Sequence, residues 1–111
     1  SSQASGFPEN FKGVPVTLPD GRRVTTIPDH MAKTFGIVET KHAVSLSMND
    51  QFRAQLQRAD EKKVPFTLVV SPSNKVISKN LWDAIHKIDG AVYQFDKATG
   101  IYTLISKRPT K

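Results

Sequence analysis

The alternation of apolar and polar positions predicts three strands in the first part of the chain. Residues 14–18 and 22–27 are rich in β-branched side chains, and Pro-Asp-Gly separates them. An Asp-Gly pair between two such runs is a strong hairpin signal, so the two runs predict paired strands. Residues 35–44 alternate again and predict a third strand.

The apolar period then changes to that of a helix. In residues 45–63, apolar side chains recur three or four positions apart, and a polar stripe lies beside them. Ser47 is the expected N-cap, because a hydroxyl before the first turn accepts a backbone N–H. The apolar stripe consists of Met48, Phe52, Leu56 and Ala59, and the polar stripe of Gln51, Gln55 and Arg58.

The second half of the chain predicts a buried strand, a second helix and two final strands. Residues 65–71 form an almost continuous apolar run, which is typical of a strand buried on both faces. Residues 77–90 are amphipathic, and strand patterns follow at 91–96 and 100–106. The order βββ-α-β-α-β(β) predicts an α/β domain whose mixed central sheet is flanked by two helices.

The first twelve positions differ in composition from the rest of the chain. Residues 1–12 are mostly polar and contain Gly6 and Pro8, so we expect a linker or the truncated edge of a larger protein. The domain itself is then expected at 13–111. No apolar run approaches the ~18 residues of a membrane helix, so no membrane segment is expected in this chain.

The charge balance favours an anionic partner. The chain has 16 Lys and Arg against 10 Asp and Glu, a formal net charge of +6. Basic domains bind nucleic acid, anionic membranes or acidic proteins, and charge alone does not choose between these partners. The chain has no cysteine, which excludes disulfides and thiolate metal sites.

Asp29, Glu39 and Lys41 are the main candidates for chemistry. Glu-x-Lys on a strand directs both side chains to one face, and Asp29 would reach that face if the strands at 22–27 and 35–44 paired as a hairpin. Two converging carboxylates bind a hard cation such as Mg²⁺. A nearby lysine orients the attacking water or offsets charge in the transition state of phosphodiester hydrolysis. The alternative is a cross-strand salt bridge on a solvated face.

Pro28-Asp29 followed by Glu39-Thr40-Lys41 resembles the PD-(D/E)xK signature of restriction-endonuclease-like nucleases. Residues 22–95 as a unit are similar to the toxin domains of bacterial polymorphic toxins, including contact-dependent inhibition and type VI effectors. In those domains a glutamine early in the following helix accompanies the site, and Gln51 matches it. The resemblance implies a restriction-endonuclease-like fold, with the nuclease toxin domain at 13–111.

The resemblance also implies a metal-dependent endonuclease with DNA as the expected substrate. Asp29 and Glu39 would hold the divalent metal, and Lys41 and Gln51 would complete the catalytic set. Mg²⁺ is the expected metal, with Mn²⁺ or Zn²⁺ as alternatives. The candidates for substrate binding are His30, Arg53 and Arg58.

Further implications concern partners and delivery. The resemblance implies a cognate acidic immunity protein and delivery within a larger effector into the cytoplasm of a competing bacterium. The alternatives are a tRNA-cleaving RNase, a non-catalytic basic module that binds nucleic acid, and a protein-interaction domain. One departure is that many members begin with a helix that supplies another glutamate, whereas here only Glu9 precedes the first expected strand.

Overall fold

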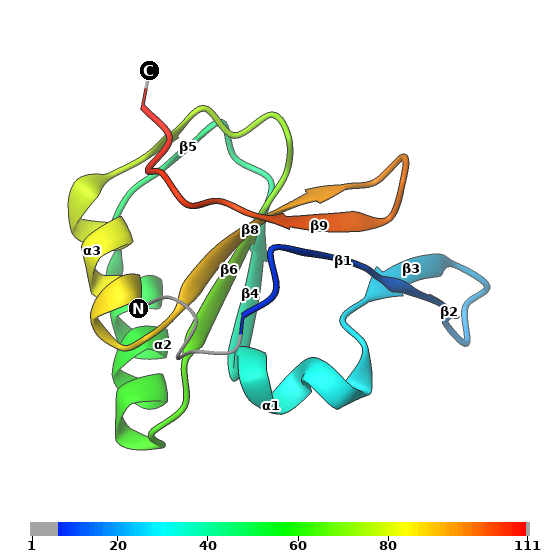
Figure 1. The fold of residues 1–111 in the computed structure, drawn as a ribbon, viewed down its shortest axis with the longest axis horizontal. Helices are drawn as coiled ribbons and strands as arrows, with labels where there is room; N and C mark the ends of the chain where they lie inside the picture. Colours follow the sequence, from blue (N-terminus) through cyan, green and yellow to red (C-terminus); the bar gives the residue numbers. More distant parts are fainter. Residues whose placement is uncertain (1–6, 111) are drawn as a thin grey trace.

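The computed structural model describes residues 7–110, and their main element is a mixed sheet of five strands in the order β1-β9-β8-β6-β4 (Figure 1). Strands β4, β6 and β8 run parallel, whereas β8, β9 and β1 pair antiparallel. The mixed α/β architecture predicted from the sequence is therefore confirmed. The strand bounds are β1 Asn10–Lys12, β4 Ile37–Lys41, β6 Phe66–Val70, β8 Ala91–Asp96 and β9 Ile101–Leu104.

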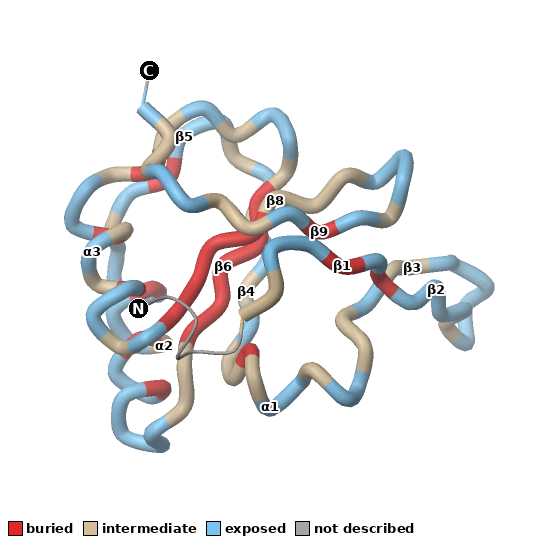
Figure 2. The backbone as a smooth tube through the Cα atoms, in the orientation of Figure 1, coloured by how far each residue is buried: buried red, intermediate tan, exposed pale blue. Residues whose placement is uncertain are grey.

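Strand β6 is the most deeply buried element. All five of its residues are buried, as Figure 2 shows, in agreement with the apolar run that predicted it. Helices α2 (Asp50–Glu61) and α3 (Lys79–Lys87) follow β4 and β6 and cover the same face of the sheet. Alternation along β6 directs Phe66, Leu68 and Val70 into the core under these helices.

The opposite face of the sheet carries an aromatic cluster. The ring of Phe11 stacks on that of Tyr102 with centroids 4.6 Å apart, and on that of Phe35 with centroids 5.2 Å apart. Tyr93 meets both Phe11 and Phe35 edge to face. Val69 of β6 belongs to this second cluster, so β6 separates two distinct cores.

The start of the domain lies earlier than expected. Residues 10–12 form β1 and pair with β9, and Phe11 is 8% exposed. The hydroxyl of Tyr93 donates a hydrogen bond to the carbonyl oxygen of Pro8 at 2.6 Å. The interpretation of 1–12 as a linker is therefore wrong for its last residues, because aromatic burial fixes them to the sheet. Residues 1–6 lie outside the described part.

Strands β2 (Val14–Thr17) and β3 (Arg23–Thr26) form the predicted hairpin, which projects from the body of the domain (Figure 1). The expected pairing of the second and third predicted strands is wrong, because β4 pairs in parallel with β6. A 3₁₀ turn η2 (Asp29–Met31) and helix α1 (Ala32–Phe35) intervene.

Burial of Phe35 explains this outcome. Phe35 is fully buried in the aromatic cluster, and its carbonyl oxygen accepts a hydrogen bond from Thr67 Oγ1 at 2.7 Å. The next residue, Gly36, has φ of 63°, and a Cβ there would lie 2.1 Å from the carbonyl oxygen of Pro65. Only glycine fits this approach, which turns the chain into β4 alongside β6.

Helix α2 begins later than expected. Its N-cap is Asn49, whose side chain accepts the backbone N–H of Phe52 at 2.8 Å. The prediction of Ser47 as the cap is wrong, because Ser45–Leu46 is a short strand β5 that pairs with β7 (Val76–Ile77). Within residues 7–110, each helix is too short or too polar to cross a membrane.

Candidate functional site

Glu39 and Lys41 lie on one face of β4, under helix α2. In the parallel register they are opposite Leu68 and Val70 of β6. Both of those residues belong to the core beneath α2 and α3, and register partners share a face, so the two charged side chains point toward α2. Their side chains are 21% and 27% exposed, so each is partly shielded from water.

Helix α2 provides two glutamines to these side chains. Gln51 and Gln55 are four residues apart and therefore share one face of the helix. Lys41 Nζ donates a hydrogen bond to Gln51 Oε1 at 3.2 Å, and Gln55 Nε2 donates one to Glu39 Oε1. Lys41 Nζ also lies 3.7 Å from Glu39 Oε2. These four side chains form one network, called here the Glu39 cluster.

The ring of Phe52 faces the ammonium group of this cluster. Phe52 is 1% exposed, and Lys41 Nζ lies 5.6 Å from its ring centroid. A cation over an aromatic face gains about 0.5–1 kcal/mol at sites that are not fully desolvated. The Glu39 carboxylate, the Gln51 amide and the Phe52 ring together hold the positive charge of Lys41 in place.

Gln55 was not among the residues selected from the sequence. Its position in the polar stripe with Gln51 was the available signal, since residues at this spacing meet the same neighbouring strand. Gln55 Oε1 is buried and has no hydrogen-bond partner among the described residues. Buried polar atoms are usually satisfied, so this acceptor indicates a place for a water molecule or an ion.

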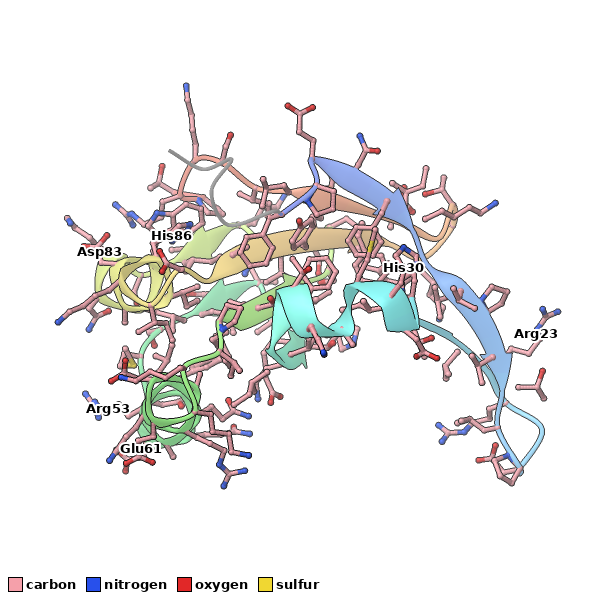
Figure 3. All side chains as sticks on the ribbon, turned by 60° about the horizontal axis from the view of Figure 1, so that its bottom comes forward. Arg23, His30, Arg53, Glu61, Asp83 and His86 are labelled. Atoms are coloured by element: carbon pink, nitrogen blue, oxygen red, sulfur yellow. The ribbon has the colours of Figure 1, made fainter. Side chains whose placement is uncertain are left out.

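The structure does not bring Asp29 into the Glu39 cluster. Asp29 starts the exposed turn η2, and Ile27 and Met31 on either side of it pack against the aromatic cluster, on the opposite face of the sheet. His30 lies in the same turn, far along the molecule from α2 (Figure 3). The metal-binding role of Asp29 therefore rests on the resemblance alone. The substrate role of His30 was expected from its position beside Asp29, and that position lies away from the Glu39 cluster.

Two further carboxylates, Asp20 of the second Pro-Asp pair and Glu9, are also separated from the cluster. Pro19-Asp20 forms the tip of the β2–β3 hairpin, where the backbone N and Nε of Arg22 donate to the Asp20 carboxylate at 3.0 and 2.8 Å. These bonds from Arg22 lower the pKa of Asp20. Glu9 directly precedes β1, which is the edge strand farthest from β4. Neither carboxylate is placed to complete the site.

The two arginines of α2 face different directions. At about 100° per residue, Arg58 returns to the side of the helix that carries Gln51, whereas Arg53 lies on the opposite side. Figure 3 shows Arg53 pointing away from the sheet, and its guanidinium pairs with Asp50 at 3.1 Å. Arg58 is exposed and is the better placed of the two to contact a substrate bound at the cluster.

A cavity of about 470 Å³ lies near Pro65, where β6 begins. It is lined by the ends of α2 and α3 and by three lysines, and no residue of the Glu39 cluster contributes to it. Lys41 lies at the other end of β4, and Glu39 lies at its middle. The candidate site is therefore a partly exposed polar cluster outside this cavity.

The oxygen atoms of the cluster fit a hard divalent cation. Among residues 7–110, no group of three His, Cys, Asp or Glu side chains is placed to hold a metal ion, and Glu39 is the one carboxylate of the cluster. Mg²⁺ commonly binds through one or two carboxylates and keeps several waters. One half-buried carboxylate beside the unsatisfied Gln55 Oε1 matches that requirement.

Comparison with protein families matches most of this chain to a known family. The model of the family described as "Restriction endonuclease fold toxin 7" matches residues 3–81. This range contains the whole Glu39 cluster and also Asp29. Comparison with curated proteins and with solved structures gave no match.

Proposed function

The chain belongs to the restriction endonuclease fold toxin 7 family, and from this membership we propose a metal-dependent endonuclease toxin that hydrolyses phosphodiester bonds of DNA. The observation that carries the proposal is the contact network of Glu39, Lys41 and Gln51 between β4 and α2. It combines a carboxylate, an ammonium group and an amide on adjacent rigid elements. These are the groups that a nuclease needs around a phosphate.

Each side chain has a distinct part in this proposal. Glu39 would hold the cation, which would supply an activated water and polarise the phosphate. Lys41 stabilises the negative charge that develops on the phosphate oxygens. Gln51 accepts a hydrogen bond from Lys41 Nζ and keeps the ammonium group in place. The resemblance makes Asp29 a second metal ligand. This role would require the η2 turn to approach the Glu39 cluster.

The charge of the chain supports an anionic substrate and an acidic inhibitor. A net charge of +6 attracts the phosphate backbone, although DNA and RNA carry the same phosphates. Within the proposal, the toxin is part of a larger effector that acts in the cytoplasm of a competing bacterium. A cognate immunity protein with an acidic surface would associate quickly because of charge complementarity.

Cleavage assays on single variants test the function. We predict that the purified domain degrades plasmid DNA with Mg²⁺, and that EDTA stops the reaction. Glu39→Gln and Lys41→Met should each reduce the rate by about 10²-fold or more, because each removes a group that acts at the phosphate. Total RNA and plasmid incubated in parallel and run on one gel identify the substrate.

Lys33→Met is the matched control for Lys41→Met. Lys33 is an exposed lysine of α1 and should be dispensable for cutting. Intact plasmid and intact RNA with the folded wild-type domain would contradict the nuclease assignment. Cleavage of RNA alone would identify RNA, in place of DNA, as the substrate.

A further inference from the structure

The orientation of the Gln55 amide is set by the charge of Glu39. Gln55 Nε2 donates to Glu39 Oε1, and this leaves Gln55 Oε1 buried and without a partner among the described residues. Turning the amide over would direct its carbonyl oxygen at the carboxylate, which repels an acceptor. The unsatisfied oxygen is therefore a consequence of how Gln55 holds Glu39.

An unsatisfied buried acceptor costs free energy, so it needs a donor in the functional state. Leaving such a group without a hydrogen bond costs the full penalty of removing it from water. Among the described residues no donor reaches this oxygen, and the ammonium group of Lys41 is directed at Gln51 and Glu39 instead. A water molecule is the remaining kind of donor that fits a polar site of this type.

A single arrangement would satisfy both side chains: a cation bound to Glu39, with one of its water molecules donating a hydrogen bond to Gln55 Oε1. A cation such as Mg²⁺ keeps several of its waters when it binds to a carboxylate. Those waters are strong hydrogen-bond donors, and outer residues that accept from them or fix the carboxylate tune the affinity of the site. In Gln55, Nε2 is placed to fix the carboxylate and Oε1 is free to accept from a bound water.

We propose that Gln55 is a positioning residue of the cation site: its N–H holds the Glu39 carboxylate, and its carbonyl oxygen accepts a hydrogen bond from a cation-bound water. This inference rests on the divalent cation of the proposed function and assigns it an additional outer residue. Gln51 has a different part, because it contacts Lys41 rather than Glu39.

Direct measurement of Mn²⁺ affinity tests this role without reference to cutting. Gln55→Met preserves the length of the side chain and removes both polar atoms. We expect this variant to bind Mn²⁺ about 10–100-fold more weakly than the wild type, as measured by electron paramagnetic resonance or calorimetry. Gln57→Met is the matched control, because Gln57 lies on the same helix, is exposed and donates a side-chain hydrogen bond to Glu61, outside the cluster.

Kinetics at varied Mn²⁺ provide the second readout. Cutting by Gln55→Met should recover at high Mn²⁺, because the change weakens the cation site rather than the chemical step. Lys41→Met should remain inactive at the same concentrations. A purely structural role for Gln55 would lower the melting temperature without this recovery.

The outcomes separate the inference from the proposed function. Wild-type affinity for Mn²⁺ in Gln55→Met, or no Mn²⁺ binding by the wild type, would overturn the role of Gln55. Binding that depends on Gln55 in a domain that cuts neither DNA nor RNA would overturn the nuclease and leave the cation site standing. If Gln55→Met does not fold, Gln55→Ala provides the same comparison.

Discussion

At the scale of residues, the ammonium group of Lys41 is held from several directions by groups of different kinds. The Gln51 amide oxygen lies at 3.2 Å, the Glu39 carboxylate at 3.7 Å and the Phe52 ring centroid at 5.6 Å. A flexible lysine on an open surface would lose much rotamer entropy on binding a phosphate. Here that cost is met on folding, because these contacts already order the ammonium group of Lys41.

For Asp29, the resemblance and the structure point to different roles. The resemblance makes Asp29 a metal ligand, so Asp29→Asn should lower plasmid cutting as strongly as Glu39→Gln. Asp20→Asn is the control, because Asp20 is the other Pro-Asp carboxylate and pairs with Arg22 at the hairpin tip. Rates for the three variants at fixed Mg²⁺ decide the question. Full activity of Asp29→Asn would leave Glu39 as the single metal-binding carboxylate of the proposal.

The sequence predicts part of the candidate site, because the strand and helix periodicities place residues that are close together in the chain. Residues two apart on a strand share a face, which placed Glu39 with Lys41, and the helical period placed Gln51 with Gln55. Periods do not say which strand a helix face meets, so the contact of Gln55 with Glu39 required the structure. The position of Asp29 depended on the pairing of distant strands, which local patterns do not determine.

At the scale of elements, the site depends on how helix α2 starts. Asn49 fixes the first turn by accepting the backbone N–H of Phe52, and Gln51 lies in that same turn. An N-cap of this kind satisfies a donor that the helix itself leaves unpaired. The cap therefore fixes where helix α2 begins, and with it the position of Gln51 relative to Lys41.

Replacement of this cap is expected to reduce stability. Asn49→Ala should lower the free energy of unfolding by about 1 kcal/mol, because the N–H of Phe52 loses its acceptor. Urea denaturation followed by circular dichroism measures the change. Ser47→Ala is the control, since Ser47 precedes the cap and should leave the midpoint almost unchanged. A larger loss for Ser47→Ala than for Asn49→Ala would identify Ser47 as the residue that stabilises the helix start.

The pattern predicted both long helices and most strands, and it failed where tertiary contacts decide. The run at 65–71 became β6, and the Asp-Gly turn became the β2–β3 hairpin. The alternation around Phe35 was interpreted as part of a strand, but burial of that ring in the aromatic cluster favours helix α1. Strand β1 was missed because its single buried side chain, Phe11, gives no visible period.

At the scale of the whole molecule, two buried tyrosines join the ends of the domain. Burial raises the pKa of Tyr93 and of Tyr102. The Tyr93 hydroxyl donates to Pro8, so ionisation would remove this bond and place a charge in an apolar cluster. The neutral phenols are therefore favoured in the folded state.

This shift predicts a loss of stability in alkali. Below about pH 10 the tyrosines are neutral in both states, and stability is fully present. Above that pH the unfolded chain loses protons that the folded chain retains, so stability falls by up to about 1.4 kcal/mol per pH unit for each group. Tyr93→Phe should be less stable than the wild type at pH 7 and should lose less stability between pH 9 and pH 11.

Urea midpoints measured at both pH values check this prediction. Lysine titration is shared by the two proteins and cancels in the comparison. Equal losses of stability for the wild type and Tyr93→Phe would show that the phenol of Tyr93 is free to ionise in the folded protein.

The pairing of β1 with β9 has a consequence for how the domain is made. Asn10 is opposite Thr103, so β1 finds its partner strand only after the whole segment between them has been synthesised. Until then Phe11 lacks the ring of Tyr102, and the aromatic core stays open. A nascent domain of this kind has no complete five-stranded sheet until its last hairpin, β8–β9, has emerged from the ribosome.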